Sequence, residues 1–401
     1  MGKIDKDLIK GSFILLIVFN LYSFLNFIFQ ASMARLLSIS DYGILGALFY
    51  LVYILGIFGE SIQNIFAKTS ATEKDNGYLK NITKRFYKKI GPLTGIFFIF
   101  YLLLGLLLYY LKDIPYTLII INGLFIFILL FLPITRGILQ GKKKFYSLGF
   151  NLITESSIKV LLSIILVLIG WRVYGAIIGA VLGTFLALIF SFAQIKNVVW
   201  YEEKKAEVIK FKEDSKSVFL VTFPLLAFYT IDIFIAQLVF DKQMAGFYTI
   251  AAILSKAIFW GTQPISKAMF PITTEKSQNQ EDTRNIYLNA FILLFIIAFI
   301  GLILFYFFPD FIIEIFSGKN ILESSSILFY LGLSTAILSF ANLNILHKVS
   351  KKNPKNPYVF FILLAISIIL LFIFHSSLKE FSLAFLVSSL LFLIGSIILH
   401  K

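Results

Sequence analysis

The sequence predicts an all-α membrane protein that crosses the bilayer about twelve times. Apolar runs of about 20 residues alternate with short polar connections from Ser12 to the last residue, and 59% of the 401 residues are hydrophobic while 14% are charged. An α-helix of about 20 apolar residues crosses a hydrocarbon core of roughly 30 Å. Only helices and closed barrels satisfy their own backbone hydrogen bonds in lipid, so the runs are expected to be transmembrane helices.

The expected spans form two sets of six, and three domains follow from them. The first set is 12–33, 44–67, 93–111, 116–133, 146–169 and 174–193. The second set is 218–240, 246–270, 286–308, 322–346, 358–374 and 381–399. The predicted domains are an N-terminal six-helix lobe at 1–195, a polar linker at 196–217 and a C-terminal six-helix lobe at 218–401.

Lysine and arginine are divided unequally between alternate connections. The connections on one side, together with both termini, hold 28 of them, and the connections on the other side hold 6. The positive-inside rule therefore places both termini in the cytoplasm of a multi-pass cell-membrane protein. The net charge of +14 is expected to meet anionic membrane lipids and not nucleic acid, because the lysines lie in short loops between apolar spans.

The two halves of the chain repeat each other. The first two spans are joined by a short loop that ends at Gly43, and the seventh and eighth spans by a loop that ends at Gly246, 203 positions later. Both halves begin on the inner side, so the repeat is parallel, with its pseudo-two-fold axis along the membrane normal. Transporters use such repeats as two lobes around a central site.

Three segments carry a resemblance to a known family. They read ARLLSISDYG at 34–43, RGILQGKKKFYSLGF at 136–150 and AGFYTIAAILSKAIFWGTQPISKAMFPI at 245–272. In their order and spacing they resemble the polysaccharide-transporter family, the Wzx-like flippases of lipid-linked oligosaccharides. That family lies in the superfamily of the MATE exporters and the lipid II flippases. The resemblance implies alternating access and transfer of a polyprenyl-diphosphate-linked oligosaccharide from the inner to the outer leaflet.

Charged residues inside the spans are the candidate site, because such charges are costly and usually face a cavity or a partner. Glu155 and Lys159 are spaced i,i+4, so they are expected on one helix face, either as a self-neutralised pair or with Lys159 lining the substrate path. Asp232 and Lys256 lie at similar depth in one outer hairpin and are expected to pair. Lys256 is alternatively a substrate contact, since ammonium groups bind phosphate.

Four further residues complete the candidate set. Arg136 is expected at the inner surface, where it either captures a diphosphate or anchors the helix, and Lys267 has the same two interpretations. Arg35, in the first outer loop, is the fifth predicted substrate-binding residue. Glu60 is either an ion-coupling carboxylate or a headgroup-level glutamate. A glycine stripe at 175, 179 and 183 is expected to pack helices.

Other classes of protein remain open at this point. A MATE-like cation-coupled exporter shares the fold but is expected to carry an acid in its first span, where this chain offers Asn20, Asn26 and Gln30. A membrane glycosyltransferase or polymerase of the same pathway needs acids or histidines on a sizeable outer loop, and the outer loops here are short. A membrane scaffold is the third alternative.

No enzyme chemistry is predicted. The chain has no cysteine and three histidines, all at span ends, and it shows no phosphate-binding loop, metal cluster or nucleophilic triad. No catalytic residue, metal site or cofactor is therefore expected. The expected partners are the lipid-linked oligosaccharide, membrane lipids, and a glycosyltransferase or polymerase of the same pathway.

Overall fold

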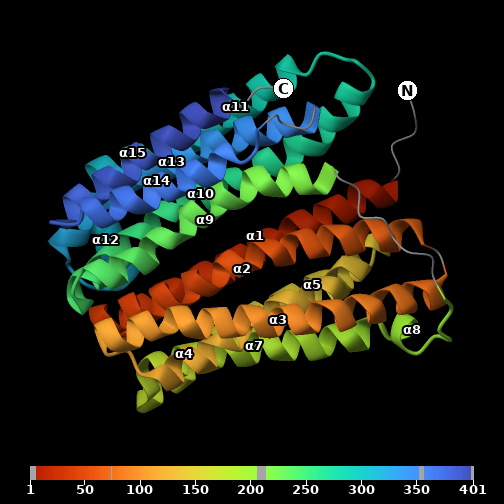
Figure 1. The fold of residues 1–401 in the computed structure, drawn as a ribbon, viewed down its shortest axis with the longest axis horizontal. Coiled ribbons are helices and arrows are strands. Elements are labelled where there is room, and N and C mark those ends of the chain that lie inside the picture. Colours follow the sequence, from red (N-terminus) through yellow and green to blue (C-terminus); the bar gives the residue numbers. More distant parts are fainter. Residues whose placement is uncertain (1–5, 74, 206–213, 352–355, 399–401) are drawn as a thin grey trace. The chain divides into compact units, whose positions relative to one another are not determined.

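The computed structural model consists of helices, with no strand among the residues that it describes, which are 6–73, 75–205, 214–351 and 356–398 (Figure 1). The chain divides into two compact units. Unit 1 comprises Met1–Asp41 and Leu51–Ile209, and unit 2 comprises Tyr42–Tyr50 and Lys210–Lys401. Within the second helix, Tyr42–Tyr50 therefore belongs to unit 2, and the residues on either side of it belong to unit 1.

Unit 1 holds the helices of the first half of the chain. They are α1 (Lys6–Leu36), α2 (Ile39–Thr72), α3 (Asn76–Lys112), α4 (Tyr116–Gly123), α5 (Phe125–Gly141), α6 (Phe145–Leu166), η1 (Val167–Trp171), α7 (Arg172–Gln194) and α8 (Lys196–Val199). Unit 2 holds the rest. They are α9 (Asp214–Val239), α10 (Lys242–Gln278), α11 (Arg284–Phe307), α12 (Pro309–Ser317), α13 (Leu322–Lys351), α14 (Val359–Ile373) and α15 (Leu378–Ile398).

Apolar helices occur at all twelve predicted spans. Ten candidate spans occur among the described residues, and one of them, Phe145–Gln194, is two helices that meet at a kink. The kink is at Gly170, whose φ of 98° is a conformation that other residues rarely adopt. The shorter apolar helix Val359–Ile373 adds the twelfth. The predicted fold class, an all-helical multi-pass membrane protein, is confirmed.

Several predicted helices are shorter than the helices in the structure. α3 begins at Asn76 and not near 93, and α10 continues to Gln278 and not only to 270. The reason is that hydropathy marks the lipid boundary, whereas the helical hydrogen bonds continue into water. Asp75 caps α3 by accepting a 2.7 Å hydrogen bond from the backbone N–H of Gly77. The short helix α12 was not predicted at all.

Four packing pairs of unit 1 have counterparts in unit 2, which supports the predicted repeat. In unit 1, α1 packs on α6, α6 on α7, α7 on α5 and α5 on α3. In unit 2, α9 packs on α14, α14 on α15, α15 on α13 and α13 on α11. Within unit 2, Gly43 lies so close to Gly246 that a Cβ added to it would be 2.9 Å from the Gly246 Cα. These two glycines occupy equivalent positions in the predicted repeat, 203 residues apart.

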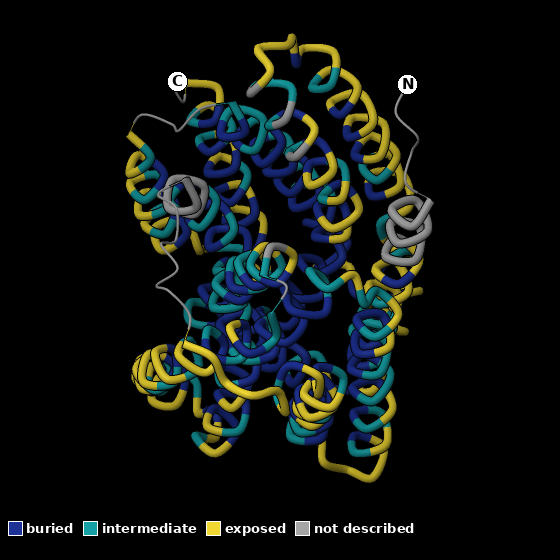
Figure 2. Tube along the Cα trace, turned by 90° about the vertical axis from the view of Figure 1, so that its right-hand side faces the viewer, coloured by how far each residue is buried: buried dark blue, intermediate teal, exposed yellow. Residues whose placement is uncertain are grey.

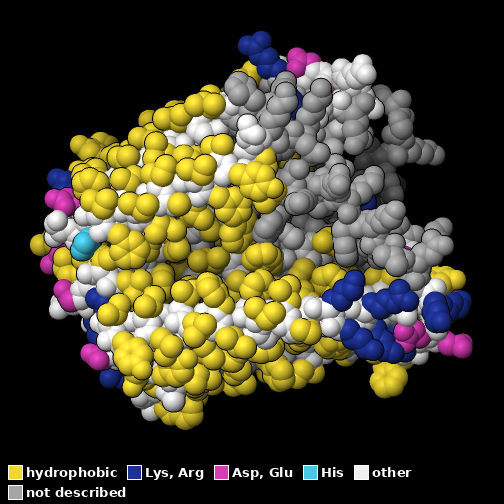
Figure 3. Space-filling view, in the orientation of Figure 1, with side chains coloured by type: hydrophobic (Ala, Val, Ile, Leu, Met, Phe, Trp, Pro, Cys, Tyr) yellow, Lys and Arg dark blue, Asp and Glu magenta, His cyan; other side chains and the backbone are white. Residues whose placement is uncertain are grey.

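The surfaces fit a membrane protein. Buried and exposed residues alternate around most helices in Figure 2, and hydrophobic side chains cover the long sides of the helices in Figure 3. In that view lysines and arginines gather at the end of unit 1 where α3 begins and α8 lies. The charge count places the connections that contain the start of α3 and α8 in the cytoplasm. The side of the membrane on which each end lies, and the predicted domain boundaries, remain predictions.

Candidate functional site

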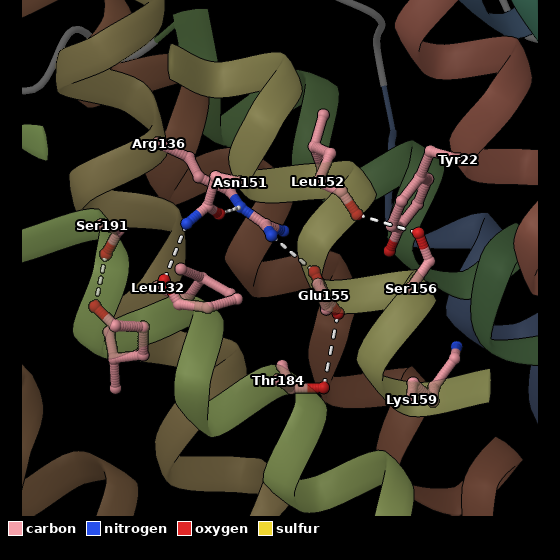
Figure 4. A network of polar contacts seen from close by, with 12 residues as sticks. Tyr22, Leu132, Arg136, Asn151, Leu152, Glu155, Ser156, Lys159, Thr184 and Ser191 are labelled. Atoms are coloured by element: carbon pink, nitrogen blue, oxygen red, sulfur yellow. Dashed lines mark hydrogen bonds and ion pairs between the residues drawn. The ribbon is translucent and has the colours of Figure 1, made fainter. Parts of the chain in front are cut away.

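A buried polar network joins α5, α6 and α7 inside unit 1 (Figure 4). Arg136, on α5, donates from Nη2 to Glu155 Oε2 at 2.5 Å and from Nε to Asn151 Oδ1 at 2.8 Å. Thr184, on α7, donates to the other carboxylate oxygen of Glu155 at 3.3 Å. Asn151 donates in turn to the backbone carbonyl of Ala187 at 2.7 Å. The ion pair is thus hydrogen-bonded from three helices, as a buried charge requires.

The sequence explains why these groups meet. Asn151, Glu155 and Lys159 are spaced four residues apart on α6, so they share one face of the helix. The glycine stripe of α7 packs against the same stretch of α6. A Cβ on Gly183 would lie 2.7 Å from the backbone N of Lys159, and one on Gly179 would lie 2.4 Å from that of Ser163. The predicted packing role of the stripe is confirmed.

Lys159 lies one turn beyond this network and makes different contacts. Its Nζ donates to Asn26 Oδ1 on α1, and it lies 4.8 Å from the centre of the Phe29 ring. The side chain is buried, at 6% exposed. An amide oxygen and an aromatic face stabilise an ammonium group, but neither carries a full negative charge.

Arg136 is buried where α6 presents Glu155 and Asn151 to it, and its place at the inner surface of the membrane remains a prediction. A second expectation about this region is wrong. Glu155 and Lys159 do not form the self-neutralised i,i+4 pair, because Arg136 binds the carboxylate from a neighbouring helix. Arg136 belongs to a different helix from Glu155, and the i,i+4 rule predicts contacts only within one helix.

The Asp232–Lys256 pair forms as the hairpin depths predict. Lys256 Nζ lies 2.7 Å from Asp232 Oδ1, and the two side chains are 1% and 0% exposed. Tyr248 donates to the second carboxylate oxygen at 3.0 Å. The ammonium of Lys256 also lies 4.3 Å from the Tyr50 ring centre and 5.2 Å from that of Tyr229. Both charges are therefore satisfied within unit 2.

The other three predicted site residues lie apart from these clusters. Glu60 on α2, Lys267 on α10 and Arg35 in the last turn of α1 are all exposed. Their assignment as substrate or ion contacts remains a prediction.

Several contributing residues escaped the sequence analysis. Asn151, Thr184 and Tyr248 complete the two ion-pair networks, and Tyr50 and Tyr229 surround Lys256. The signal for Asn151 was available, since it precedes Glu155 by one helical turn. Nothing in the sequence distinguishes Tyr50, Tyr229 and Tyr248 from the other tyrosines of the chain, which has 19 in all. No group of three or more His, Asp or Glu that could hold a metal ion occurs in the described part of the chain.

Outside the spans, the start of the linker is fastened to the beginning of α3. Lys204 forms a 2.7 Å ion pair with Asp75, and its backbone N–H donates to the Gly77 carbonyl at 3.2 Å. Glu203 accepts hydrogen bonds from Lys84 at 2.7 Å and Asn81 at 2.6 Å. We refer to these contacts as the linker clasp.

The clasp shifts the pKa values of its charged groups. The hydrogen bond from Lys204 lowers the pKa of Asp75, and the hydrogen bond from Lys84 lowers the pKa of Glu203. The bond to Asp75 raises the pKa of Lys204. All three are solvent-exposed, so the ion pairs position the linker more than they stabilise the fold.

Comparison with solved structures shows which known proteins share this fold. The chain is similar to an inward-facing multidrug resistance MATE family transporter of the MOP superfamily, with a TM-score of 0.72, 14% identity, and coverage of 94% of this chain and 92% of that one. It is also similar to the lipid II flippase MurJ in an inward closed conformation, with a TM-score of 0.70, 17% identity, and coverage of 96% and 87%. The chain is thus a multi-pass membrane protein with the transporter and flippase fold of these proteins.

The family is shown by a separate comparison. A family model described as "Polysaccharide biosynthesis protein" matches residues 32–326, and the chain belongs to that family. No curated protein matches the sequence. The predicted resemblance to polysaccharide transporters is confirmed at this level.

Proposed function

We propose that this protein is a flippase that moves a polyprenyl-diphosphate-linked oligosaccharide from the inner to the outer leaflet by alternating access, for the synthesis of a cell-surface polysaccharide. Its family supports the pathway, and its fold supports the transport. The proposed partners are the lipid-linked oligosaccharide, the surrounding lipids, and the glycosyltransferases or polymerase that make and use it.

The observation that carries the proposal is an unmatched buried cation. Among the described residues the buried charged side chains are Asp41, Arg136, Glu155, Lys159, Asp232 and Lys256. All except Lys159 form a direct ion pair: Arg172 at 2.9 Å for Asp41, and the two ion pairs above for the others. Lys159 interacts with Glu155, one turn away, only at longer range. A substrate diphosphate would supply the direct ion pair that Lys159 lacks. Lys159 is therefore the proposed substrate contact.

The remaining predicted cations have other roles in this proposal. Arg136 holds α5 to α6 beside Lys159, and Lys256 holds α10 to α9. An exporter of organic cations would instead need an available buried acid. The two acids buried within the spans, Glu155 and Asp232, are already neutralised, which disfavours that alternative.

The test is a flipping assay with the purified chain in liposomes. The probe is a fluorescent polyprenyl-diphosphate N-acetylglucosamine, and flipping is measured as loss of the fraction protected from a membrane-impermeant reductant. We expect wild-type protein and Lys159→Arg to flip the probe, and Lys159→Gln to lose most of that activity. Lys89→Gln, which changes an exposed lysine of α3 with no proposed role in the site, is the matched control and should stay near wild type.

Two results would contradict the proposal. The first is no protein-dependent flipping of the diphosphate probe alongside protein-dependent uptake of an organic cation such as ethidium. The second is equal flipping by Lys159→Gln and wild type, which would remove Lys159 from the site. A probe lacking the diphosphate should not be flipped.

A further inference from the structure

An open pocket of about 260 Å³ lies where α3 ends and α4 begins in unit 1. Its lining residues are Tyr109, Tyr110, Asp113, Ile114 and Pro115. The charge count places this end of α3 on the outer side of the membrane. The pocket is far along α3 from Asn76 and the linker clasp, so it is separate from the buried networks described above.

Aromatic rings form the wall of this pocket. The Tyr109 and Tyr110 rings meet edge to face with centroids 5.0 Å apart, and Tyr109 meets Tyr116 in the same way at 5.9 Å. Each contact sets the edge of one ring against the face of the other and fixes the rings relative to one another. Tyr110 is 75% exposed, so most of its ring surface is left uncovered.

Asp113 adds a carboxylate that the fold does not use. Its backbone closes α3 in a left-handed conformation with φ of 50°, and its N–H donates to the Tyr109 carbonyl at 3.1 Å. Its carboxylate has no hydrogen-bond or ion-pair partner in the part of the chain that the structure describes. A negative charge at the C-terminal end of a helix is also disfavoured by the helix dipole. The left-handed conformation tolerates an aspartate, but no ion pair among the described residues neutralises its charge.

The equivalent end of α11 carries the same residue types in a different arrangement. There Tyr306, Phe307 and Asp310 follow the same spacing, but Pro309 starts α12 at once. Asp310 consequently lies in the first turn of a helix, where its charge is favourable. The Tyr306 ring packs edge to face on Phe307 and Phe329, at 5.1 and 5.3 Å.

We infer that the Tyr109–Tyr110–Asp113 pocket binds a sugar ring. A tyrosine face packs against the apolar C–H face of a sugar, and a carboxylate accepts hydrogen bonds from two neighbouring hydroxyl groups. The volume lies just below that of pockets for drug-sized ligands, so it fits one sugar ring and not a whole oligosaccharide. The inference rests on the proposed function for the source of the sugar, which would be the glycan arriving at the outer surface.

The test is saturation-transfer NMR of the full chain in lipid nanodiscs with glucose, galactose and N-acetylglucosamine as separate probes. We expect at least one probe to receive saturation, with binding about three- to tenfold weaker in Tyr110→Ala. Asp113→Asn should also weaken binding, and Tyr110→Phe should retain most of it. Tyr306→Ala and Asp310→Asn are the matched controls and should bind as wild type does. Thermal melting of each variant confirms that it is folded.

Each other outcome overturns the inference. If no probe receives saturation, or if Tyr110→Ala and Tyr306→Ala bind equally, the tyrosines serve only as interfacial anchors, which is their common role in membrane proteins. The result is separable from the flippase proposal. Flipping of the diphosphate probe without sugar binding rejects the pocket alone, and sugar binding lost in Tyr110→Ala without any flipping rejects the flippase alone.

Discussion

Breaking the buried ion pair of unit 2 should destabilise the protein strongly. The perturbations are Asp232→Asn and Lys256→Met, each of which leaves the other charge without its partner. The asparagine retains an oxygen that accepts the 3.0 Å hydrogen bond from Tyr248, so this change isolates the charge. In Lys256→Met the apolar side chain keeps its place between the Tyr50 and Tyr229 rings.

The size of the effect follows from the burial of the pair. The side chains of Lys256 and Asp232 are 1% and 0% exposed, so solvent does not screen the charge that remains. Removing one partner of such a pair costs about 3–5 kcal/mol. For a unit of about 200 residues this corresponds to a fall in Tm of roughly 6–20 °C. The exposed pair Lys276–Glu281, 3.6 Å apart, is the control, and Glu281→Gln should cost less than about 1 kcal/mol.

The assay combines thermal melting in detergent with the flipping assay on the two single variants and the double variant. The double variant removes both charges, and replacing a whole buried pair is often neutral for stability. Since Asp232 already neutralises Lys256, we expect the double variant to recover both Tm and flipping. A double variant as unstable as the single variants would refute the ion-pair reasoning. A stable but inactive one would show that Lys256 contacts the substrate.

Two further predictions concern the ends of the molecule, and both use the absence of native cysteine. In intact cells an impermeant thiol reagent should label Lys319→Cys and leave Lys205→Cys unlabelled. Labelling at 205 would reverse the predicted topology. The linker clasp should be stable at neutral pH. Because the pKa values of Asp75 and Glu203 are lowered, their contribution is present above about pH 4 and is lost as the pH falls through the folded pKa. Because the pKa of Lys204 is raised, its contribution is lost only as the pH rises above about 10.4. A spin label at position 205 should therefore gain mobility below about pH 4, and unchanged mobility there would argue against the clasp.

The helices of this protein were largely predictable, because lipid imposes a simple rule on sequence. A run of apolar residues long enough to cross the bilayer must be a helix, and the twelve expected spans all occur. The Asp232–Lys256 pair was predictable for a related reason. Both residues lie in one hairpin, so their depth could be counted from a shared loop.

The contacts of unit 1 were not predictable in the same way. Arg136 reaches Glu155 from a different helix, and Asn26 reaches Lys159 across 133 positions of sequence. The spacing of residues along one helix predicts which side chains share a face of that helix. It does not predict which neighbouring helix packs on that face. The glycine stripe on α7 gave the missing information in part, since it marks the place where α6 approaches most closely.

Lys159, the buried cation of unit 1 without a direct ion pair, is a feature on which the proposed transport cycle could depend. Glu155 is only one turn from Lys159, yet its two carboxylate oxygens already accept hydrogen bonds from Arg136 and Thr184. Asn151 in turn accepts a hydrogen bond from Arg136 and holds it beside Glu155. Glu155 therefore cannot turn to Lys159 without leaving Arg136 as a buried, unpaired charge. The empty carrier must instead stabilise Lys159 with Asn26 and Phe29, which are weaker partners than a carboxylate. An arriving diphosphate would gain a full charge interaction without breaking an existing ion pair, so binding would favour the conformation in which Lys159 faces the substrate.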